Sequence, residues 1–109
     1  MKLTPELLIS AYSQGYFPMP ERESGEMRWY KPNPRAIIPL DGFHVSRSLQ
    51  RRIRKNIFTV SFDTNFQQVM EACAKHPDTW ITSEFIEVYT QLFERGYAHS
   101  VEVWQEDRL

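Results

Sequence analysis

Residues 58–73, FTVSFDTNFQQVMEAC, contain the change of hydrophobic period that decides the fold class of this chain. Apolar side chains occupy every second position from Phe58 to Phe62, which predicts a half-buried strand. Thr64, with Gln67 three residues later, then forms a candidate capping box at the start of a helix. The core-facing positions of that helix are Phe66, Val69, Met70 and Cys73.

A second helix is predicted over residues 83–95, on the carboxyl side of this segment. Thr82 is its candidate cap, and Gly96 is where we expect it to end. Apolar side chains three and four positions apart form the face that we expect to point inward. They are Phe85, Val88, Tyr89 and Leu92.

Residues 99–104 alternate again and predict a second strand, followed by a turn at residues 105–108. The order strand, helix, helix, strand fits an α/β or an α+β fold, of which we predict α+β. Two strands leave a sheet with open edges, and two helices are too few to cover it. We therefore expect the chain to be a fragment or to pair with other chains.

A short helix that opens at Ser46 carries an excess of positive charge. Projecting its residues at about 100° each places Leu49 and Ile53 on one side and four cations on the other. These cations are Arg47, Arg51, Arg54 and Lys55. Like charges four residues apart repel, and solvated faces usually mix both signs. We therefore favour a phosphate-binding stripe over a merely solvated helix face.

Residues 15–39, GYFPMPERESGEMRWYKPNPRAIIP, form an aromatic segment without the period of a helix or a strand, because its prolines remove backbone donors and fix φ. Two interpretations stay open: a surface loop whose rings pack on the core, or a rigid loop that presents flat faces to a nucleobase. Within it, residues 21–28 predict an exposed tip. Residues 35–40 are strand-like but contain Pro39, which confines them to a sheet edge or a strand end.

The amino-terminal residues predict a helix that begins at Thr4 and stops at Gly15. This helix brings Tyr12 next to the aromatic segment, either as a core anchor or as part of the same binding wall. The sequence MKLTPELLIS does not resemble a secretory signal, and no apolar run is long enough to cross a bilayer. We expect a cytoplasmic protein without membrane contact.

The composition and motifs exclude several kinds of chemistry. The chain has 109 residues, 13 basic and 14 acidic, with the cations concentrated between Arg35 and Lys55. It contains no glycine-rich phosphate loop, no His-Glu-x-x-His and a single cysteine, so we expect neither a cofactor nor a metal.

Other chemistry-bearing side chains have ordinary structural explanations. We expect Cys73 to be a buried thiol and His99 a satisfied strand residue, and Trp80 to be either a core residue or half exposed before a helix. The candidate general acids and bases are solubilising glutamates on this interpretation. They are Glu84, Glu87 and Glu102.

Five segments, in this order and spacing, resemble the leucyl/phenylalanyl-tRNA–protein transferases. They are AYSQGYFPM (11–19), RWYKPNPRAIIPL (28–40), FHVSRSLQR (43–51), TWI (79–81) and GYAHSVEVW (96–104). The resemblance implies an enzyme that moves leucine or phenylalanine from aminoacyl-tRNA to the amino-terminal Arg or Lys of a protein and so marks it for degradation. It implies a small amino-terminal domain, residues 1–34, and the first half of an acetyltransferase-like (GNAT-like) β-α-α-β domain, residues 35–109. The sequence does not decide among leucine, phenylalanine and methionine.

The resemblance also assigns roles by position. The cationic helix face, Arg47, Arg51, Arg54 and Lys55, matches the cluster used for the tRNA backbone. Trp80 matches a tryptophan placed at the terminal adenosine. Met19 stands where some members carry a second tryptophan, so a softer thioether–aromatic contact would replace stacking there. Phe17 belongs to the same Phe-Pro run, and Tyr12 and Tyr89 match tyrosines near that pocket.

Members of the family continue past the last turn into strands that carry the residues orienting the acceptor amine. We therefore assign no catalytic residue within these 109 residues and expect the chain to be inactive alone. The alternatives are a non-catalytic tRNA- or RNA-binding module and an acyl-CoA-dependent acetyltransferase relative. On the main interpretation, the cationic helix and the aromatic side chains form one continuous surface.

Overall fold

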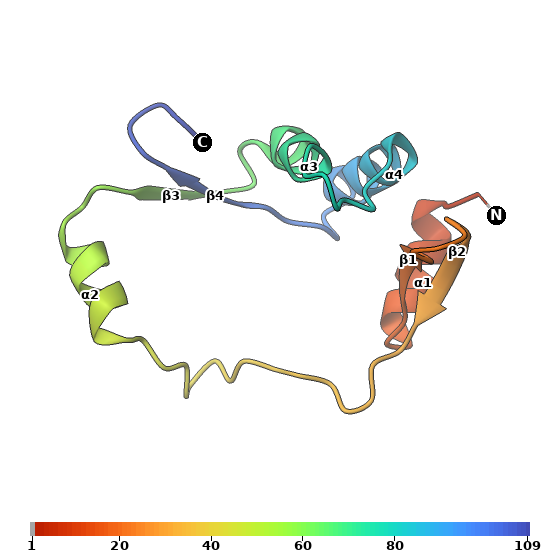
Figure 1. The fold of residues 1–109 in the computed structure, drawn as a ribbon, viewed down its shortest axis with the longest axis horizontal. Coiled ribbons are helices and arrows are strands. Elements are labelled where there is room, and N and C mark those ends of the chain that lie inside the picture. The colour runs from red at the N-terminus through yellow and green to blue at the C-terminus, as the bar shows by residue number, and fades with distance from the viewer. Residues whose placement is uncertain (1) are drawn as a thin grey trace.

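The structure, a computed structural model, describes residues 2–109 and contains helices and short antiparallel strand pairs (Figure 1). In chain order its elements are α1 (Pro5–Ser13), β1 (Phe17–Pro20), β2 (Met27–Tyr30), α2 (Arg47–Arg54), β3 (Thr59–Phe62), α3 (Phe66–Ala74), α4 (Ser83–Glu94) and β4 (Val101–Trp104). β1 pairs with β2, and β3 pairs with β4. The predicted α+β fold and its β-α-α-β order are confirmed.

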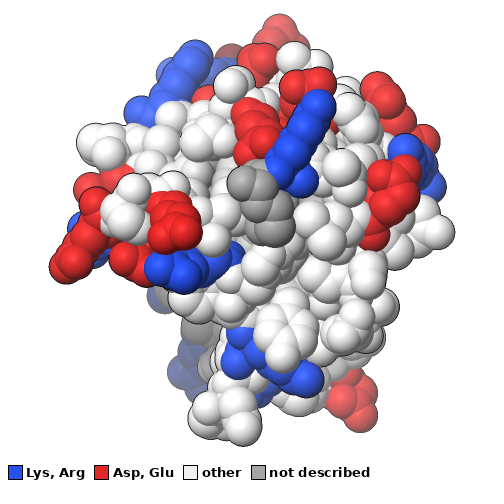
Figure 2. Space-filling view, turned by 90° about the vertical axis from the view of Figure 1, so that its right-hand side faces the viewer, with Lys and Arg blue, Asp and Glu red and all other residues white. Residues whose placement is uncertain are grey.

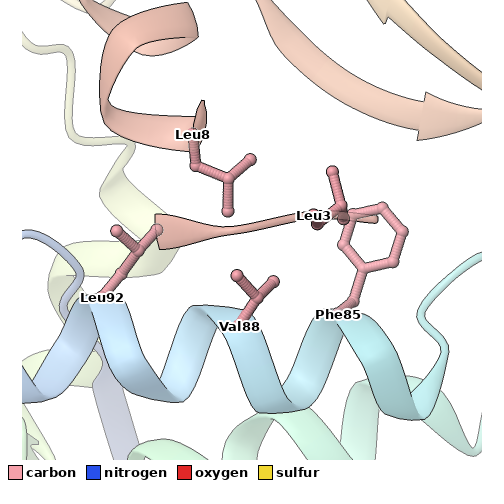
Figure 3. Close-up of a cluster of buried hydrophobic side chains, with 5 residues drawn as sticks. All are labelled: Leu3, Leu8, Phe85, Val88 and Leu92. Atoms are coloured by element: carbon pink, nitrogen blue, oxygen red, sulfur yellow. The ribbon is translucent and has the colours of Figure 1, made fainter. Parts of the chain in front are cut away.

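The hydrophobic core lies between the amino-terminal segment and α4. Figure 3 shows its buried side chains facing one another: Leu3, Leu8, Phe85, Val88 and Leu92. The inward face predicted for α4 is therefore confirmed. Because the amino-terminal segment and α4 share this core, the boundary between residues 34 and 35 stays a prediction.

α1 begins and ends as its sequence predicts. The Thr4 hydroxyl accepts a hydrogen bond from the Leu7 N–H at 3.1 Å, and Pro5 occupies the first turn. Gly15 follows the helix with φ +87°, a left-handed conformation that glycine adopts without strain. The Tyr16 N–H then closes the end of the helix on the Ala11 carbonyl at 2.9 Å. These contacts direct the chain from α1 straight into β1.

The aromatic segment contains a β-hairpin, which its lack of period did not predict. Pro18 and Pro20 fit into β1 because they alternate with the residues that bond across the ladder. The Glu21 N–H donates to the Glu26 carbonyl at 2.8 Å, which makes Glu21 a hydrogen-bonded position of the ladder. Hydrogen-bonded positions recur at every second residue, so Pro18 and Pro20 occupy the positions between them, where no cross-strand donor is needed. The predicted exposed tip is confirmed, and Arg28 forms ion pairs with Glu21 and Glu26 across its base, each at 3.1 Å.

The strand predicted over residues 35–40 is wrong. Residues 31–46 contain neither helix nor strand and are almost entirely exposed. Pro39 removes one backbone donor, and no strand in the described part of the chain pairs with this segment. Residues 31–46 are therefore an extended connection between β2 and α2, visible along the lower side of Figure 1.

α2 is capped by Ser46 as predicted, since the Ser46 hydroxyl accepts from the Leu49 N–H at 3.2 Å. The helix has no buried residue, and its apolar side chains Leu49 and Ile53 are exposed. In Figure 1 it stands apart from the other helices, at the end opposite to α1.

Two expectations for α3 are wrong: the cap by Thr64 and the burial of Cys73. Thr64 does not cap the helix; the cap position is Asn65, without a side-chain bond, because the Thr64 hydroxyl donates to Glu102 instead. Cys73 is exposed rather than buried. Of the predicted stripe, Phe66 alone is fully buried, stacked on Phe93 with ring centroids 4.7 Å apart.

The β3–β4 sheet buries the face opposite to the one that its apolar residues occupy. Glu102 on β4 is completely buried, whereas the apolar side chains of both strands are more than half exposed. These are Val60, Phe62, Val101 and Val103. The half-buried strand predicted from its apolar alternation thus has its apolar face open.

Candidate functional site

A groove of about 720 Å³ lies between the β1–β2 hairpin and the segment that leads into α4. Met19 and Tyr30 line it from the hairpin, and Trp80 lines it from the other side. We call it the aromatic groove. Its volume is in the range of ligand pockets, and it brings together Met19 and Trp80, which are 61 positions apart in the chain.

Trp80 is partly packed and partly exposed. Its ring meets Phe85 edge-on, with centroids 5.3 Å apart and an interplanar angle of 73°. The residue is 42% exposed, so the interpretation of Trp80 as a core residue is wrong. The Ile81 N–H donates to the Thr79 hydroxyl at 3.1 Å and fixes the backbone beside it. Such a ring is positioned for stacking without being covered.

Tyr12 and Tyr89 meet across the interface between α1 and α4. Their hydroxyl oxygens are 2.7 Å apart, and Tyr89 also stacks on Phe85, with centroids 5.9 Å apart. Burial, with the hydrogen bond to Tyr12, raises the pKa of Tyr89, so this hydroxyl stays protonated at neutral pH. Phe85 thus touches both Trp80 and Tyr89 and connects the aromatic groove to the tyrosine pair.

The tyrosine pair lines a second, mostly apolar groove of about 630 Å³ between α1, α3 and α4. His99 lies at this groove, and its Nδ1 is 2.8 Å from the Asp63 carboxylate. This bond and the Ser100 N–H lower the pKa of Asp63. His99 precedes β4 and is exposed, so it is not a strand residue as expected. Its hydrogen-bond partner is the Asp63 carboxylate.

Phe17 does not line either groove. It packs against its cross-strand partner Tyr30, with ring centroids 5.8 Å apart, and so lies on the same face of the hairpin as the lining residues Met19 and Tyr30. Of the side chains predicted at the tRNA end, Trp80 and Met19 share one groove, Tyr12 and Tyr89 pair with each other, and Phe17 packs on the lining residue Tyr30.

The cations predicted for the tRNA backbone lie together on α2 and its cap. Arg47, Arg51, Arg54 and Lys55 are all exposed, and none has an acidic partner in the described part of the chain. By contrast, the face of the molecule in Figure 2 intersperses acidic and basic side chains. On α2, instead, positive side chains gather without acidic ones between them.

The expectation of one continuous surface is wrong, because the structure does not bring α2 to the aromatic groove. Figure 1 places α2 and the β1–β2 hairpin, which forms one wall of the groove, at opposite sides of a molecule whose longest extent is 47 Å. Leu49 and Ile53 contribute to no core, and the segment 31–46 that connects α2 to the hairpin has no regular structure. In residues 2–109, α2 therefore has no buried contact that would hold it near the groove.

Glu102 is the buried charge that the sequence interpretation missed. The hydroxyls of Ser100, Thr64 and Ser61 and the Thr64 N–H all donate to its carboxylate, with the Ser61 and Thr64 hydroxyls at 2.7 Å. These bonds, led by that of Ser100, outweigh burial and lower the pKa of Glu102 to about 2. The Trp104 indole N–H donates in turn to Ser61 at 2.9 Å.

The interpretation of Glu102 as a solubilising side chain is therefore wrong. The signal in the sequence was three hydroxyl residues close to Glu102 in the paired strands: Ser61 directly opposite it on β3, Thr64 in the turn after β3, and Ser100 two positions before it. Together they hold an ionised carboxylate that ties β3, the β3–α3 turn and β4 to one another.

Two further findings concern metals and membranes. Residues 2–109 contain no group of three or more side chains placed to hold a metal ion. No helix in that range has both the length and the apolar character needed to cross a bilayer.

Comparison with known proteins places this chain in a family. The family model described as leucyl/phenylalanyl-tRNA protein transferase matches residues 37–109, and the model for the amino-terminal domain of that transferase matches residues 1–33. Proteins named leucyl/phenylalanyl-tRNA–protein transferase are similar to this chain over nearly its whole length.

Those of Salinibacter ruber and Herpetosiphon aurantiacus are each 55% identical to this chain, over 98% and 99% of its length, and that of Gloeobacter violaceus is 47% identical over 98%. The matched part is 47%, 56% and 55% of the respective relatives, so the chain spans about half the length of the curated relatives it matches. On this evidence the chain belongs to the leucyl/phenylalanyl-tRNA–protein transferase family.

Proposed function

We propose that this chain supplies the aminoacyl-tRNA-binding part of an aminoacyltransferase. The enzyme would move leucine or phenylalanine from tRNA to the amino-terminal Arg or Lys of an acceptor protein. The family supports this proposal through the name that the relatives carry. The observation that carries it is the aromatic groove, where the partly exposed ring of Trp80 lies opposite the hairpin residue Met19.

The terminal adenosine of the tRNA is the ligand that we assign to this groove. An unpaired base has a flat face, and stacking it on an aromatic side chain contributes about 1–3 kcal/mol. Trp80 packs against Phe85 at an interplanar angle of 73° and stays 42% exposed, so part of its ring is open to a ligand. The neighbouring hydroxyls of Tyr12 and Tyr89 share one hydrogen bond, so the pair has a further hydroxyl proton to donate to a sugar or ester oxygen.

The tRNA backbone is the ligand that we assign to α2. Four unpaired cations on the helix and its cap can neutralise phosphates and release counterions. Because α2 and the groove stand apart, we assign them to separate points on one extended ligand. The assignments of Arg47, Arg51, Arg54 and Lys55 share this basis.

The proposed reaction is the aminolysis of an ester. The acceptor nitrogen attacks the carbonyl carbon, a C–N bond forms, and the bond from carbonyl carbon to ribose oxygen breaks. The proton lost by the amine is matched by the one that the ribose oxygen gains. The tRNA ester is already activated, so positioning can supply much of the rate. We assign no catalytic residue to this chain and place its part of the work in binding.

The wider role follows from this reaction. We infer that the modified proteins enter degradation through the N-end rule, and that the protein works in the cytoplasm, where aminoacyl-tRNA is made and used. We also keep the division into an amino-terminal domain, residues 1–34, and the first half of a catalytic domain, residues 35–109, as part of the proposal.

The test of the α2 assignment is tRNA binding measured over a range of salt concentrations. Arg51→Ala with Arg54→Ala should flatten the dependence of log affinity on log salt by about two units, about one for each lost phosphate contact. Lys75→Ala with Arg108→Ala is the matched control, because it also removes two exposed cations and leaves α2 intact. Equal slopes for the two double variants would contradict the assignment.

A further inference from the structure

Among the described residues that line the aromatic groove, Arg22 is the one cation. It lies in the turn between β1 and β2 and is exposed. No ion pair within residues 2–109 includes its guanidinium. A guanidinium that is free beside an aromatic surface suits a ligand in which an anion is attached to a flat ring, because its planar N–H groups match the oxygens of a phosphate.

The hairpin tip that carries Arg22 is held in place by its neighbours. The Gly25 N–H donates to the Glu21 carbonyl at 2.8 Å and closes the turn. Arg28 pairs with Glu21 and with Glu26, so both of these acids already have a cationic partner. The backbone under Arg22 is therefore fixed while its charge stays available, which reduces the entropy lost when a ligand binds.

The two walls of the aromatic groove differ in charge. Asp78 lines the wall formed by residues 78–82, on the side of Trp80, and is exposed. No ion pair in the described chain links Asp78 to Arg22. An anionic group is thus attracted to the hairpin wall and repelled from the wall of Trp80. This difference gives the groove a direction that a charged ligand must follow.

A nucleotide has groups that match this direction. Its ribose connects a flat base, a 5′ phosphate and a 3′ oxygen, and in the proposed function the base stacks on Trp80. The ester on the ribose is assigned to the Tyr12–Tyr89 pair, which offers a hydroxyl proton. The 5′ phosphate then remains for the hairpin wall, where Arg22 can donate two parallel N–H bonds to its oxygens.

We infer that Arg22 holds the 5′ phosphate of the terminal nucleotide of the tRNA and so sets the direction in which that nucleotide enters the aromatic groove. This inference rests on the proposed function and adds to it a phosphate contact at the groove, separate from the cations of α2. The reverse orientation would place the phosphate beside Asp78 and is disfavoured by the like charge.

The test compares two nucleotides that have the same base and the same charged group. Adenosine 5′-monophosphate and adenosine 3′-monophosphate are titrated into the 109-residue chain, with the indole N–H of Trp80 followed by ¹H–¹⁵N NMR. We expect the 5′ isomer to bind about 3- to 10-fold more tightly. Intact tRNA should displace it, and tRNA without the terminal adenosine should need a concentration at least about fivefold higher.

Three variants separate the contact of Arg22 from a general effect of charge. Arg22→Gln should abolish the preference for the 5′ isomer. Arg22→Lys should retain part of it, because an ammonium keeps the charge without the two parallel bonds. Lys75→Gln is the matched control: it also removes one exposed cation, at a residue outside the groove, and should leave the preference unchanged.

Equal affinity of the wild-type chain for the two isomers would overturn the inference, and this readout needs no variant to fold. If Trp80→Ala still weakens both isomers, the assignment of the groove survives that result. Binding that is absent, or that Trp80→Ala does not change, would overturn the groove assignment and the inference together. A preference that persists in Arg22→Gln would assign the phosphate to another residue. Failure of intact tRNA to displace the 5′ isomer would make a free nucleotide the occupant.

Discussion

Replacing Phe85 by leucine should weaken both the core and the candidate site, because this ring contacts two side chains of that site, Trp80 and Tyr89. Phe85 is fully buried, meets Trp80 edge-on at 5.3 Å and stacks on Tyr89 at 5.9 Å. Each aromatic pair contributes about 0.5–1.5 kcal/mol beyond its burial. Leucine keeps most of the apolar volume, so the loss of two pairs should lower the free energy of unfolding by about 1–3 kcal/mol.

The matched control is Phe66→Leu. Phe66 is also buried but forms a single ring pair, with Phe93, at 4.7 Å. Its replacement should lower the free energy of unfolding by about half as much, about 0.5–1.5 kcal/mol, and should leave the environment of Trp80 unchanged. Urea denaturation of the two variants gives the free energies, and ¹H–¹⁵N NMR of the indole N–H groups reports on Trp80.

The reasoning fails if the two variants lose equal stability and the indole signal of Trp80 does not move in Phe85→Leu. Phe85 would then be an ordinary core residue, and its ring contacts with Trp80 and Tyr89 would not contribute to stability.

Three further predictions concern single hydrogen-bonding groups. Glu102→Gln should lower the free energy of unfolding at neutral pH. The folded pKa of Glu102, about 2, lies below its ordinary 4.5, so the difference in stability from wild type should shrink as pH falls from about 4.5 to 2. A stability difference independent of pH would contradict the burial of an ionised group. Thr4→Ala should lower the free energy of unfolding by about 0.5–2 kcal/mol through the lost cap of α1, and an unchanged urea midpoint would speak against that cap. Tyr12→Phe should cost about 0.5–1.5 kcal/mol, the range for one hydrogen bond, and should lower the pKa of Tyr89 in an absorbance titration; an unaltered titration would show that the pair does not exist in solution.

The sequence predicted best where local chemistry decides the structure. The cap and glycine stop of α1 depend on Thr4 and Gly15, which act within one helical turn of their own positions. The inward face of α4 follows from its spacing alone. Such features need no knowledge of distant residues.

The failures occur where a distant residue decides. Thr64 had a good local cap geometry in sequence, yet its hydroxyl is taken by Glu102, 38 positions away. The proline-rich β1 strand forms because its partner strand needs no donor at Pro18 and Pro20, which only the pairing register reveals. The open face of the β3–β4 sheet belongs to the same class, since burial of that face requires polypeptide outside this sheet.

The candidate site divides in the same way. The resemblance proposed Met19 and Trp80 together, and the structure places them in one groove. The separation of α2 from that groove could not be predicted, because helix amphipathicity gives the direction of a face and not the position of the helix.

Binding of tRNA with and without its terminal adenosine tests the central claim most directly. The wild-type chain should bind the intact tRNA about 5- to 150-fold more tightly than the shortened one, the equivalent of about 1–3 kcal/mol for one stacked base. Trp80→Ala should bind both with the same reduced affinity. Equal binding of the two tRNAs by the wild-type chain, or a preference that persists in Trp80→Ala, would contradict the assignment of the aromatic groove to the end of the tRNA.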